Sequence, residues 1–306
     1  MRVFVAGASG AIGRPLVPLL VAAGHDVTGT TRSPEKAAAI EAAGATAAVV
    51  DALDSAALRV AVEQARPEVV VHQLTALPAR FDPRRKELYD ETNRLRTDST
   101  RTLIDAAPGA RVIAQSIAFA YRPHAEPVVL DEDAPLFTSA PQPFGAATRA
   151  VAEMERMVLE AGGLVLRYGW FYGPGTYYGE GGSMAKDVAR RRFPMVGAGT
   201  ALMSFVHVDD AAAATVAAVE RGAPGVYNVV DDDPAPTREW LPVYAEALGA
   251  RRPLRVPVWL VRLVAGKGVA AMATTLPGAT NARAKEELAW APRWASWRAG
   301  FLDAPR

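Results

Sequence analysis

The sequence predicts an α/β fold with a doubly wound parallel sheet and a small, mostly helical C-terminal substrate domain. Two observations support this prediction. Short apolar runs alternate with helical patterns over the first two thirds of the 306 residues, and a glycine-rich turn follows the first run. Continuously apolar strands separated by helices are typical of a parallel sheet that helices cover on both faces. Ligands of such a sheet bind at the carboxyl ends of its strands.

The elements of this fold can be assigned in chain order. Six apolar runs are predicted strands: residues 2–6, 26–31, 46–50, 68–73, 111–116 and 163–168. The first helix is expected over 11–23, and the second after Ser33, which we expect to cap it, with Pro34 in the first helical position. Residues 204–220 predict a strand followed by an alanine-rich helix, and 225–230 predict a further strand.

Composition excludes several classes of protein and site. The 34 basic and 33 acidic residues nearly balance, so neither a nucleic acid nor an anionic membrane is implied as a partner. The chain has no cysteine, which excludes disulfides, thiolate nucleophiles and cysteine-type zinc sites. Its four histidines are scattered without ligand spacing, so we expect no metal site.

Two further features bear on location. The N-terminal residues enter a strand at once, without the pattern of a signal peptide. The apolar stretch 256–273 is interrupted by Arg262, Gly266 and Lys267, so it is too short and too charged to span a bilayer. We therefore expect a soluble cytoplasmic protein that acts on a small molecule. The sequence leaves open whether the protein is a monomer or a homodimer.

A dinucleotide site is predicted by the segment VFVAGASGAIGRPLVPLL, which places Gly7, Gly10 and Gly13 between the first strand and the first helix. Glycines at these positions let the backbone turn tightly and let phosphate oxygens approach the amides at the helix N-terminus. Their spacing is G-x-x-G-x-x-G. The strand-turn-helix context makes the motif more informative than glycine spacing alone.

The end of the second strand favours NADP(H) as the cofactor. An enzyme that uses NAD places an acidic residue there to hold the ribose 2′-hydroxyl, whereas this chain has Thr30, Thr31 and Arg32. An arginine can bind a 2′-phosphate through two parallel hydrogen bonds, and Arg14 and Lys36 would add positive charge. The alternative is that Arg32 is only a solvated loop charge.

The chain divides accordingly into two predicted parts. Residues 1–172 and 201–230 are assigned to an NADP-binding Rossmann domain, and residues 173–200 and 231–306 to a substrate-binding domain or lid. The segment GWFYGPGTYYGEGGS, rich in glycine and aromatic residues, is expected to be a mobile loop on the substrate side. From Asp231 onward the chain is expected to be mostly helical.

Six segments in this order cover nearly the whole chain: GASGAIG, VVDALD, VVVHQLTA, VIAQSIAFAY, LRYGWFYGPG and SFVHVDDAA. Together they resemble the motifs of the extended short-chain dehydrogenase/reductase family, of the epimerase/dehydratase type. The resemblance implies that Asp51 meets the adenine, that Ser116 is the catalytic serine, and that the segment from Tyr172 to Pro174 packs beside the nicotinamide.

The glycine turn, the second strand and these segments together predict the cofactor site. Its expected residues are Gly7, Ser9, Gly10, Ala11, Ile12, Gly13, Arg14, Arg32, Lys36, Asp51, Ala52, Leu74, Thr75, Tyr172, Gly173 and Pro174. The expected substrate pocket is formed by Tyr121, Trp170, Tyr177, Tyr178 and His207. The aromatic residues of the loop could either stack on the substrate or form the core of a lid, and the sequence leaves both alternatives open. For His207 the alternative is a core histidine whose hydrogen bonds are satisfied within the protein.

The family's defining pair, Tyr-x-x-x-Lys, falls on the segment PQPFGAATRAVAEMERM, where the matching residues are Phe144 and Thr148. In the family the tyrosine exchanges a proton with the reacting oxygen, and the lysine lowers that tyrosine's pKa. Neither residue here can do this. The place of the family's helix asparagine falls on Arg96. The resemblance is therefore to an atypical member.

Loss of the tyrosine does not by itself abolish chemistry. A positioned general acid contributes about 10² to 10⁴ in rate, whereas alignment of the reactants can supply roughly 7 to 11 kcal/mol. We therefore expect an NADPH-dependent ketoreductase for a bulky or aromatic carbonyl compound, with the proton supplied by the substrate or by water. The alternatives are a non-reductive isomerase, cyclase or dehydratase, and a catalytically silent NADP(H) sensor.

Overall fold

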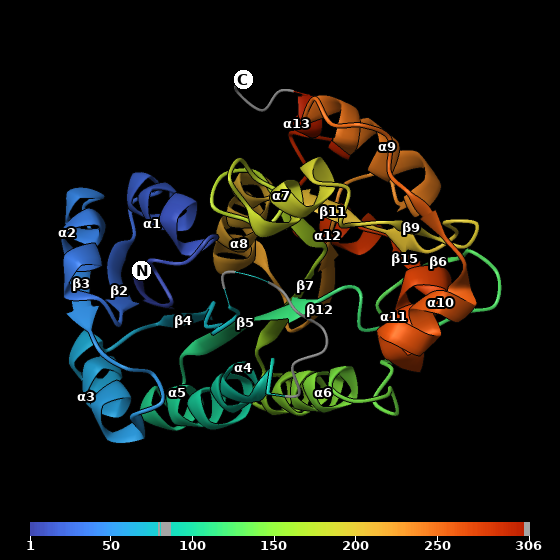
Figure 1. Ribbon diagram of the computed structural model, residues 1–306. Coiled ribbons are helices and arrows are strands. Elements are labelled where there is room, and N and C mark those ends of the chain that lie inside the picture. The colour runs from blue at the N-terminus through green and yellow to red at the C-terminus, as the bar shows by residue number, and fades with distance from the viewer. Residues whose placement is uncertain (79, 81–86, 303–306) are drawn as a thin grey trace.

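The computed structural model describes residues 1–78, 80 and 87–302 and is built around one seven-stranded parallel sheet (Figure 1). The strand order is β12-β7-β5-β4-β1-β2-β3. The strands are β1 (Arg2–Ala6), β2 (Asp26–Thr31), β3 (Thr46–Val49), β4 (Val69–His72), β5 (Arg111–Ile117), β7 (Leu164–Tyr168) and β12 (Gly225–Val229). The chain passes from β1 to β3 on one side and from β4 onward on the other, so the order reverses between β1 and β4. The predicted doubly wound sheet is confirmed.

Helices cover both faces of this sheet (Figure 1). One layer contains α1 (Gly13–Ala22), α2 (Pro34–Ala42) and α8 (Val208–Arg221), and the other contains α3 (Ser55–Ala65), α4 (Asp90–Arg94), the π-helical segment η1 (Leu95–Ser99), α5 (Thr100–Ala106) and α6 (Phe144–Glu160). Leu16, Leu20 and Ile40 pack against one face of the sheet, and Leu58 and Leu103 pack against the other. Because both faces are buried at the centre of the sheet, strands such as β1 and β4 are largely apolar.

Two details of the first two helices differ from the prediction. The first helix begins at Gly13 instead of residue 11, since the glycine turn precedes it. Ser33 does stand at the N-cap of α2, but its hydroxyl does not cap the helix and donates to the Glu35 carboxylate instead. The capping prediction for Ser33 was therefore wrong.

The remaining elements lie mostly beyond the carboxyl ends of the sheet strands. Short strands pair across long sequence separations: β8 (Trp170–Tyr172) with β11 (Phe205–His207), β9 (Met195–Val196) with β14 (Arg255–Val256), β10 (Leu202–Met203) with β13 (Ala235–Pro236), and β6 (Val129–Leu130) with β15 (Gly278–Ala279). The helices here are α7 (Ser183–Ala189), α9 (Thr237–Ala247), α10 (Val258–Val264), α11 (Gly266–Thr275), α12 (Ala282–Glu287) and α13 (Trp297–Leu302). The expected helical character of the C-terminal part is confirmed.

The C-terminal part contacts the sheet directly. Ala284 of α12, Leu288 and Trp290 are buried in the same core cluster as β1 and α1. The division into two domains stays a prediction, and residues 303–306 of the second part lie outside the described residues. Within the described part of the chain, no helix is both long enough and apolar enough to cross a membrane.

Candidate active site

The glycine turn forms a cradle of backbone at the N-terminus of α1. Gly7 has a φ of +96°, and a Cβ atom there would lie 2.9 Å from the carbonyl oxygen of Gln73. A Cβ on Gly13 would overlap the carbonyls of Gly7 and Ala8. The Gly7 N–H donates to the Thr30 hydroxyl at 3.0 Å, which fixes the turn to β2. Side chains are thus excluded from the place where the amides of a helix N-terminus can bind a pyrophosphate, so the turn fits a dinucleotide.

The carboxyl end of β2 carries the residues predicted to select the cofactor. The hydroxyls of Ser9 and Thr31 lie 3.0 Å apart, joining the glycine turn to this strand end. Arg32 is exposed, and its Nη1 donates to Glu91 Oε1 of α4 at 2.6 Å. An exposed ion pair of this kind contributes about 0–1 kcal/mol, so a phosphate dianion could displace Glu91. Lys36 is exposed nearby on α2.

The third and fourth strands end in the other predicted cofactor contacts. Asp51 is exposed after β3, and its Oδ1 accepts the N–H of Leu53 at 3.0 Å. His72, the last residue of β4, is buried; its Nδ1 accepts the N–H of Leu74 and its Nε2 lies 3.2 Å from Leu95 O in η1. The histidine therefore orders the backbone on which Leu74 and Thr75 stand. Of the predicted contacts here, Ala52 is buried, Leu74 is half-buried and Thr75 is exposed.

Arg96 follows Leu95 directly in the same π-helical segment and is 6% exposed. Its Nη1 has no hydrogen-bond partner among the residues that the structure describes, and burial lowers its pKa to about 10. The residue that matches the family's helix asparagine is thus a buried guanidinium.

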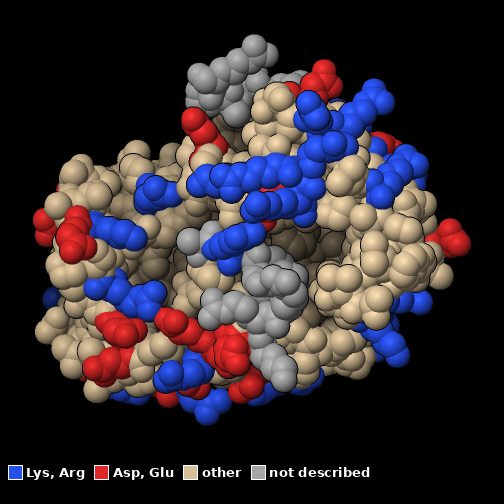
Figure 2. Space-filling model, in the orientation of Figure 1, with Lys and Arg blue, Asp and Glu red and all other residues tan. Residues whose placement is uncertain are grey.

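The loop after β8 reaches across the carboxyl edge of the sheet. A Cβ on Gly175 would overlap the guanidinium of Arg14, so this loop passes directly against the first turn of α1. Tyr177 Oη donates to the carbonyl of Pro78, in the segment after β4, at 2.5 Å. These contacts join the first turn of α1, the loop after β8 and the segment after β4 at the carboxyl edge of the sheet. In Figure 2 the same side of the molecule is hollowed, and Lys and Arg side chains gather along the upper part of the hollow.

Ser116, the predicted catalytic serine, does not lie in this exposed region. Its side chain is fully buried, and its hydroxyl donates to Glu155 Oε1 of α6 at 2.5 Å. Arg167 of β7 donates to both oxygens of the same carboxylate, at 2.9 and 2.7 Å. Because the Ser116 proton is engaged and the hydroxyl has no exposed surface, we correct the prediction and assign Ser116 a structural role.

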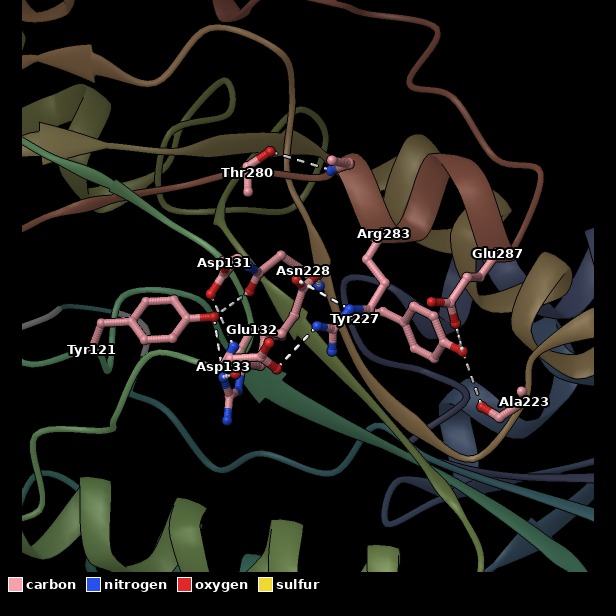
Figure 3. Close-up of polar contacts among 12 residues, drawn as sticks. Tyr121, Asp131, Glu132, Asp133, Ala223, Tyr227, Asn228, Thr280, Arg283 and Glu287 are labelled. Carbon is pink, nitrogen blue, oxygen red and sulfur yellow. Dashed lines mark hydrogen bonds and ion pairs between the residues drawn. The ribbon is translucent and has the colours of Figure 1, made fainter.

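Tyr121 is buried and joins the same network through Arg167. Figure 3 shows its hydroxyl beside Asn228. Its hydroxyl donates to Asn228 Oδ1 at 2.7 Å and accepts from Arg167 at 3.1 Å. Glu132 completes the network, because its Oε1 accepts the N–H of Asn228 at 2.7 Å and Arg283 Nε lies 3.7 Å from its other oxygen. Burial raises the pKa of both Tyr121 and Glu132. The network holds the segment after β5 onto β7 and β12.

Two aromatic residues of the predicted site are buried in the core: Tyr178, expected in the substrate pocket, and Tyr172, expected beside the nicotinamide. Tyr178 is 6% exposed and packs edge-on against Phe205 and Trp240. The Tyr172 ring is buried too, and its hydroxyl has no hydrogen-bond partner within the described part of the chain. Burial raises its pKa. We correct the pocket prediction for Tyr178. Tyr172 is buried, Gly173 is half-buried and Pro174 is exposed. Their contact with the nicotinamide stays a prediction.

His207 and Trp170 have different environments. The His207 ring is buried, stacks on Trp294 at a centroid distance of 3.9 Å, and accepts the N–H of Asp209 through Nδ1. Burial lowers its pKa, so His207 is the satisfied core histidine that stood as the alternative. Trp170 is half-buried and stacks on Phe119 at 3.9 Å. Trp170 and Tyr177 remain candidates for the substrate side.

Phe144 and Thr148 stand on the first two turns of α6. Phe144 packs against the buried cluster that contains Ile117, the last residue of β5. Thr148 is fully buried, and its Oγ1 lies 2.9 Å from Phe137 O and 3.1 Å from Gly145 O, so its proton is given to the backbone. The start of α6 therefore presents neither a proton donor nor a positive charge from these two residues.

The sequence did not reveal the contact of Arg14 with the loop or the Ser116–Glu155–Arg167 network. One signal for the network was present: an arginine inside the otherwise apolar run GLVLRY must be paired if the strand is central. No signal in the sequence pointed to the position of Arg14, because that contact joins segments more than 150 residues apart.

Comparison with known proteins agrees with this geometry. The family model described as NAD dependent epimerase/dehydratase family matches residues 3–229. A 3-diazoavenalumate denitrifying reductase from a Streptomyces species is 50% identical over 308 residues, which cover 98% of this chain and 99% of that protein. A 4-hydroxy-2-methyl-3-oxo-4-farnesyl-3,4-dihydroquinoline-1-oxide ketoreductase from Stigmatella aurantiaca is 28% identical over 293 residues, 91% of this chain and 83% of that one.

Among solved structures, human epimerase family protein SDR39U1 with NADPH is similar in fold. Its TM-score is 0.73 at 23% identity, and the match covers 99% of both chains. The family resemblance expected from the motifs is confirmed by these matches, and the dinucleotide cradle fits the nucleotide cofactor of the family. The chain therefore belongs to the NAD dependent epimerase/dehydratase family of enzymes, as an atypical extended short-chain dehydrogenase/reductase.

Proposed function

We propose that this enzyme is an NADPH-dependent reductase that removes a diazo group, as nitrogen, from an aromatic carboxylate. The observation that carries the proposal is the pair Phe144 and Thr148 at the start of α6, which offers neither an exchangeable acid nor a cation. It is supported by the 50% identity, over nearly the whole chain, to a protein whose name describes a reductase of a diazo-substituted carboxylate.

The chemistry of a diazonium group explains why such a site needs no proton donor. When bound, NADPH would supply a hydride, and the balanced reaction is Ar–N₂⁺ + NADPH → Ar–H + N₂ + NADP⁺. No proton enters this equation, whereas reduction of a ketone needs one for the new hydroxyl. A lysine at position 148 would also repel a cationic substrate. Phe144 and Thr148 thus suit a positively charged hydride acceptor.

The chain's own residues would act by holding the two reactants. Gly7, Gly10 and Gly13 keep side chains away from the N-terminus of α1, where backbone amides would bind the pyrophosphate, and Arg32 would hold a 2′-phosphate. Tyr177, by its bond to Pro78, holds the loop after β8 over the same edge. Positioning of this kind can supply roughly 7 to 11 kcal/mol of the barrier.

A ketoreductase is the second candidate, and it is supported by the Stigmatella relative of that name. In that case the substrate or a water would provide the proton, since the start of α6 provides none. A non-reductive reaction and a cofactor sensor without turnover are the further outcomes that an experiment has to separate.

Deuterium transfer tests the proposal. The protein is incubated with NADPH labelled with deuterium on either face of C4, and with 4-carboxybenzenediazonium or 2-hydroxyacetophenone. We expect deuterium at the ring carbon that loses nitrogen, with one N₂ released per NADPH oxidised. Labelled alcohol from the ketone alone would overturn the diazo proposal in favour of the ketoreductase. Unlabelled product, or NADPH binding without turnover, would contradict both.

A variant pair provides the control. Phe144→Tyr with Thr148→Lys supplies a proton donor and a cation, whereas Phe144→Tyr with Thr148→Met supplies similar bulk without the charge. We expect the lysine variant to be at least about tenfold slower with the diazonium compound than the methionine variant, because of charge repulsion. Equal rates of the two variants would show that the cation is irrelevant to the reaction.

A further inference from the structure

A cavity of about 520 Å³ lies between the start of α6 and the hairpin of helices α10 and α11. Its size is within the range of about 300 to 1,000 Å³ that is typical of small-molecule sites. The lining residues are Pro123, Phe137, Ala140, Pro141, Phe144, Arg262, Lys267, Gly268, Ala271, Met272 and Thr275. We call it the α6–α11 cavity.

The walls of the α6–α11 cavity are mostly apolar. The lining includes Phe137 and Phe144 from the segment around the start of α6 and Ala271 and Met272 from α11. A Cβ on Gly268 would lie 3.3 Å from Pro141 Cβ, so α11 closes against the segment that precedes α6. Two aromatic rings facing a thioether and small side chains suit a planar aromatic ligand.

One end of the cavity is positively charged. Arg262 of α10 and Lys267 of α11 line it, and no lining residue is acidic. Within residues 1–78, 80 and 87–302, neither cation forms an ion pair with an acidic side chain. Helix α11 begins at Gly266, so its positive N-terminal end adds to the same potential. An anionic group is favoured there.

Phe144 connects the cavity to the sheet. Phe144 lines the cavity and also packs against the cluster of Ile117, at the carboxyl end of β5. Ligands of a doubly wound sheet bind at this edge. A ligand in the cavity would therefore have one end near the ends of the sheet strands and its charged end at the α10–α11 hairpin.

We propose that the α6–α11 cavity binds the aromatic carboxylate substrate, with its ring between Phe144 and α11 and its carboxylate on Arg262 and Lys267. Arginine binds a carboxylate through two parallel hydrogen bonds, and lysine adds a point charge. The identity of the reacting group rests on the proposed function. The recognition of an aromatic ring and a carboxylate rests on the cavity alone.

Binding measured without turnover tests this inference. The probes are 4-hydroxycinnamate and its uncharged methyl ester, titrated calorimetrically into the full-length protein saturated with NADP⁺. We expect the wild type to bind the acid at least about tenfold more tightly than the ester. The variant R262Q/K267Q should bind both within about twofold of each other. The control R238Q/R251Q removes two exposed arginines outside the cavity and should keep the preference.

A second variant tests the location. Ala271→Trp fills the cavity, and we expect it to weaken both probes at least about tenfold without loss of NADP⁺ binding. No preference for the acid in the wild type, a preference kept by R262Q/K267Q, or unchanged binding by A271W would each overturn the inference. If the variants behave as expected but no deuterium is transferred, the cavity assignment stands and the proposed reaction fails.

Discussion

Arg32 is the residue on which the choice of cofactor depends. Its guanidinium is exposed at the end of β2 and is held by Glu91. Charge-assisted hydrogen bonds contribute about 1.5–3 kcal/mol each, so we expect Arg32→Ala to weaken NADPH binding about 10- to 100-fold and to change NADH binding less than about twofold. Fluorescence titration of both cofactors measures the two dissociation constants.

Glu91→Gln is the matched control for this prediction. It releases Arg32 from its carboxylate partner without removing the guanidinium, so NADPH affinity should be kept or increased. If Arg32→Ala weakened the binding of both cofactors equally, or if the wild type bound NADH more tightly than NADPH, Arg32 would not bind the 2′-phosphate.

At the scale of single residues, the sequence predicted backbone-determined positions better than side-chain directions. The glycine turn forms as expected because Gly7 and Gly13 leave no room for a Cβ atom. Ser116 was misassigned because a motif gives the residue and not the face of the strand. It stands opposite Arg167 in the sheet register, and both side chains turn toward Glu155. The hydrogen-bond partners of a side chain buried between the sheet and a helix depend on residues that are distant in sequence.

At the scale of elements, the long regular pieces were predictable and the short ones were not. Strands such as β1, β4 and β7 are predicted from apolar runs because both faces of each strand are buried. The pairs β9 with β14 and β6 with β15 have two residues per strand and join segments far apart in the chain. So few residues have no detectable periodicity, and only tertiary contacts determine them.

His72 links two of these elements and makes their association sensitive to pH. Its Nε2 lies 3.2 Å from Leu95 O of η1, while its Nδ1 accepts the N–H of Leu74 just after β4. Burial lowers its pKa to about 4 from an ordinary value of 6.5. Between these two values the unfolded chain takes up a proton that the folded chain does not, so stability falls as the pH falls. The full difference is about 3 kcal/mol, of which about 2 kcal/mol is lost by pH 5.

We therefore expect His72→Gln to remove this part of the pH dependence. Urea unfolding at pH 7 and pH 5 should give the wild type a loss of stability about 2 kcal/mol larger than that of the variant. Other buried groups titrate as well, so the difference between the proteins is the relevant quantity. His124→Gln is the control, since His124 is exposed, and it should behave as the wild type. A wild-type pH dependence in His72→Gln would contradict the assignment.

At the scale of the whole molecule, the C-terminal part is tied to the sheet by buried carboxylates and by apolar packing. Asp210 of α8 accepts the N–H groups of Arg293 and Trp294 at 2.8 and 3.1 Å. Asp231, which follows β12, accepts the N–H of Trp297 at 2.7 Å. Burial raises the pKa of both aspartates. The sequence indicated a separate helical part, but it could not indicate that the last third of this part packs into the core around β1 and α1.

Because the C-terminal part packs into the core of the sheet, we expect the molecule to unfold as one unit. Trp290 is 5% exposed within the core cluster of β1, α1 and α8, so Trp290→Ala should cost about 3–5 kcal/mol through the cavity it leaves. Trp259 on α10 is 66% exposed, and the same substitution there should change stability by less than about 0.5 kcal/mol.

Urea unfolding followed by both far-ultraviolet circular dichroism and fluorescence measures the stability of both variants. Because Trp290 packs in the nucleotide-binding core, both signals of Trp290→Ala should shift together in one transition. Two separate transitions, with the sheet retaining wild-type stability, would instead mean that the C-terminal part folds as an independent domain.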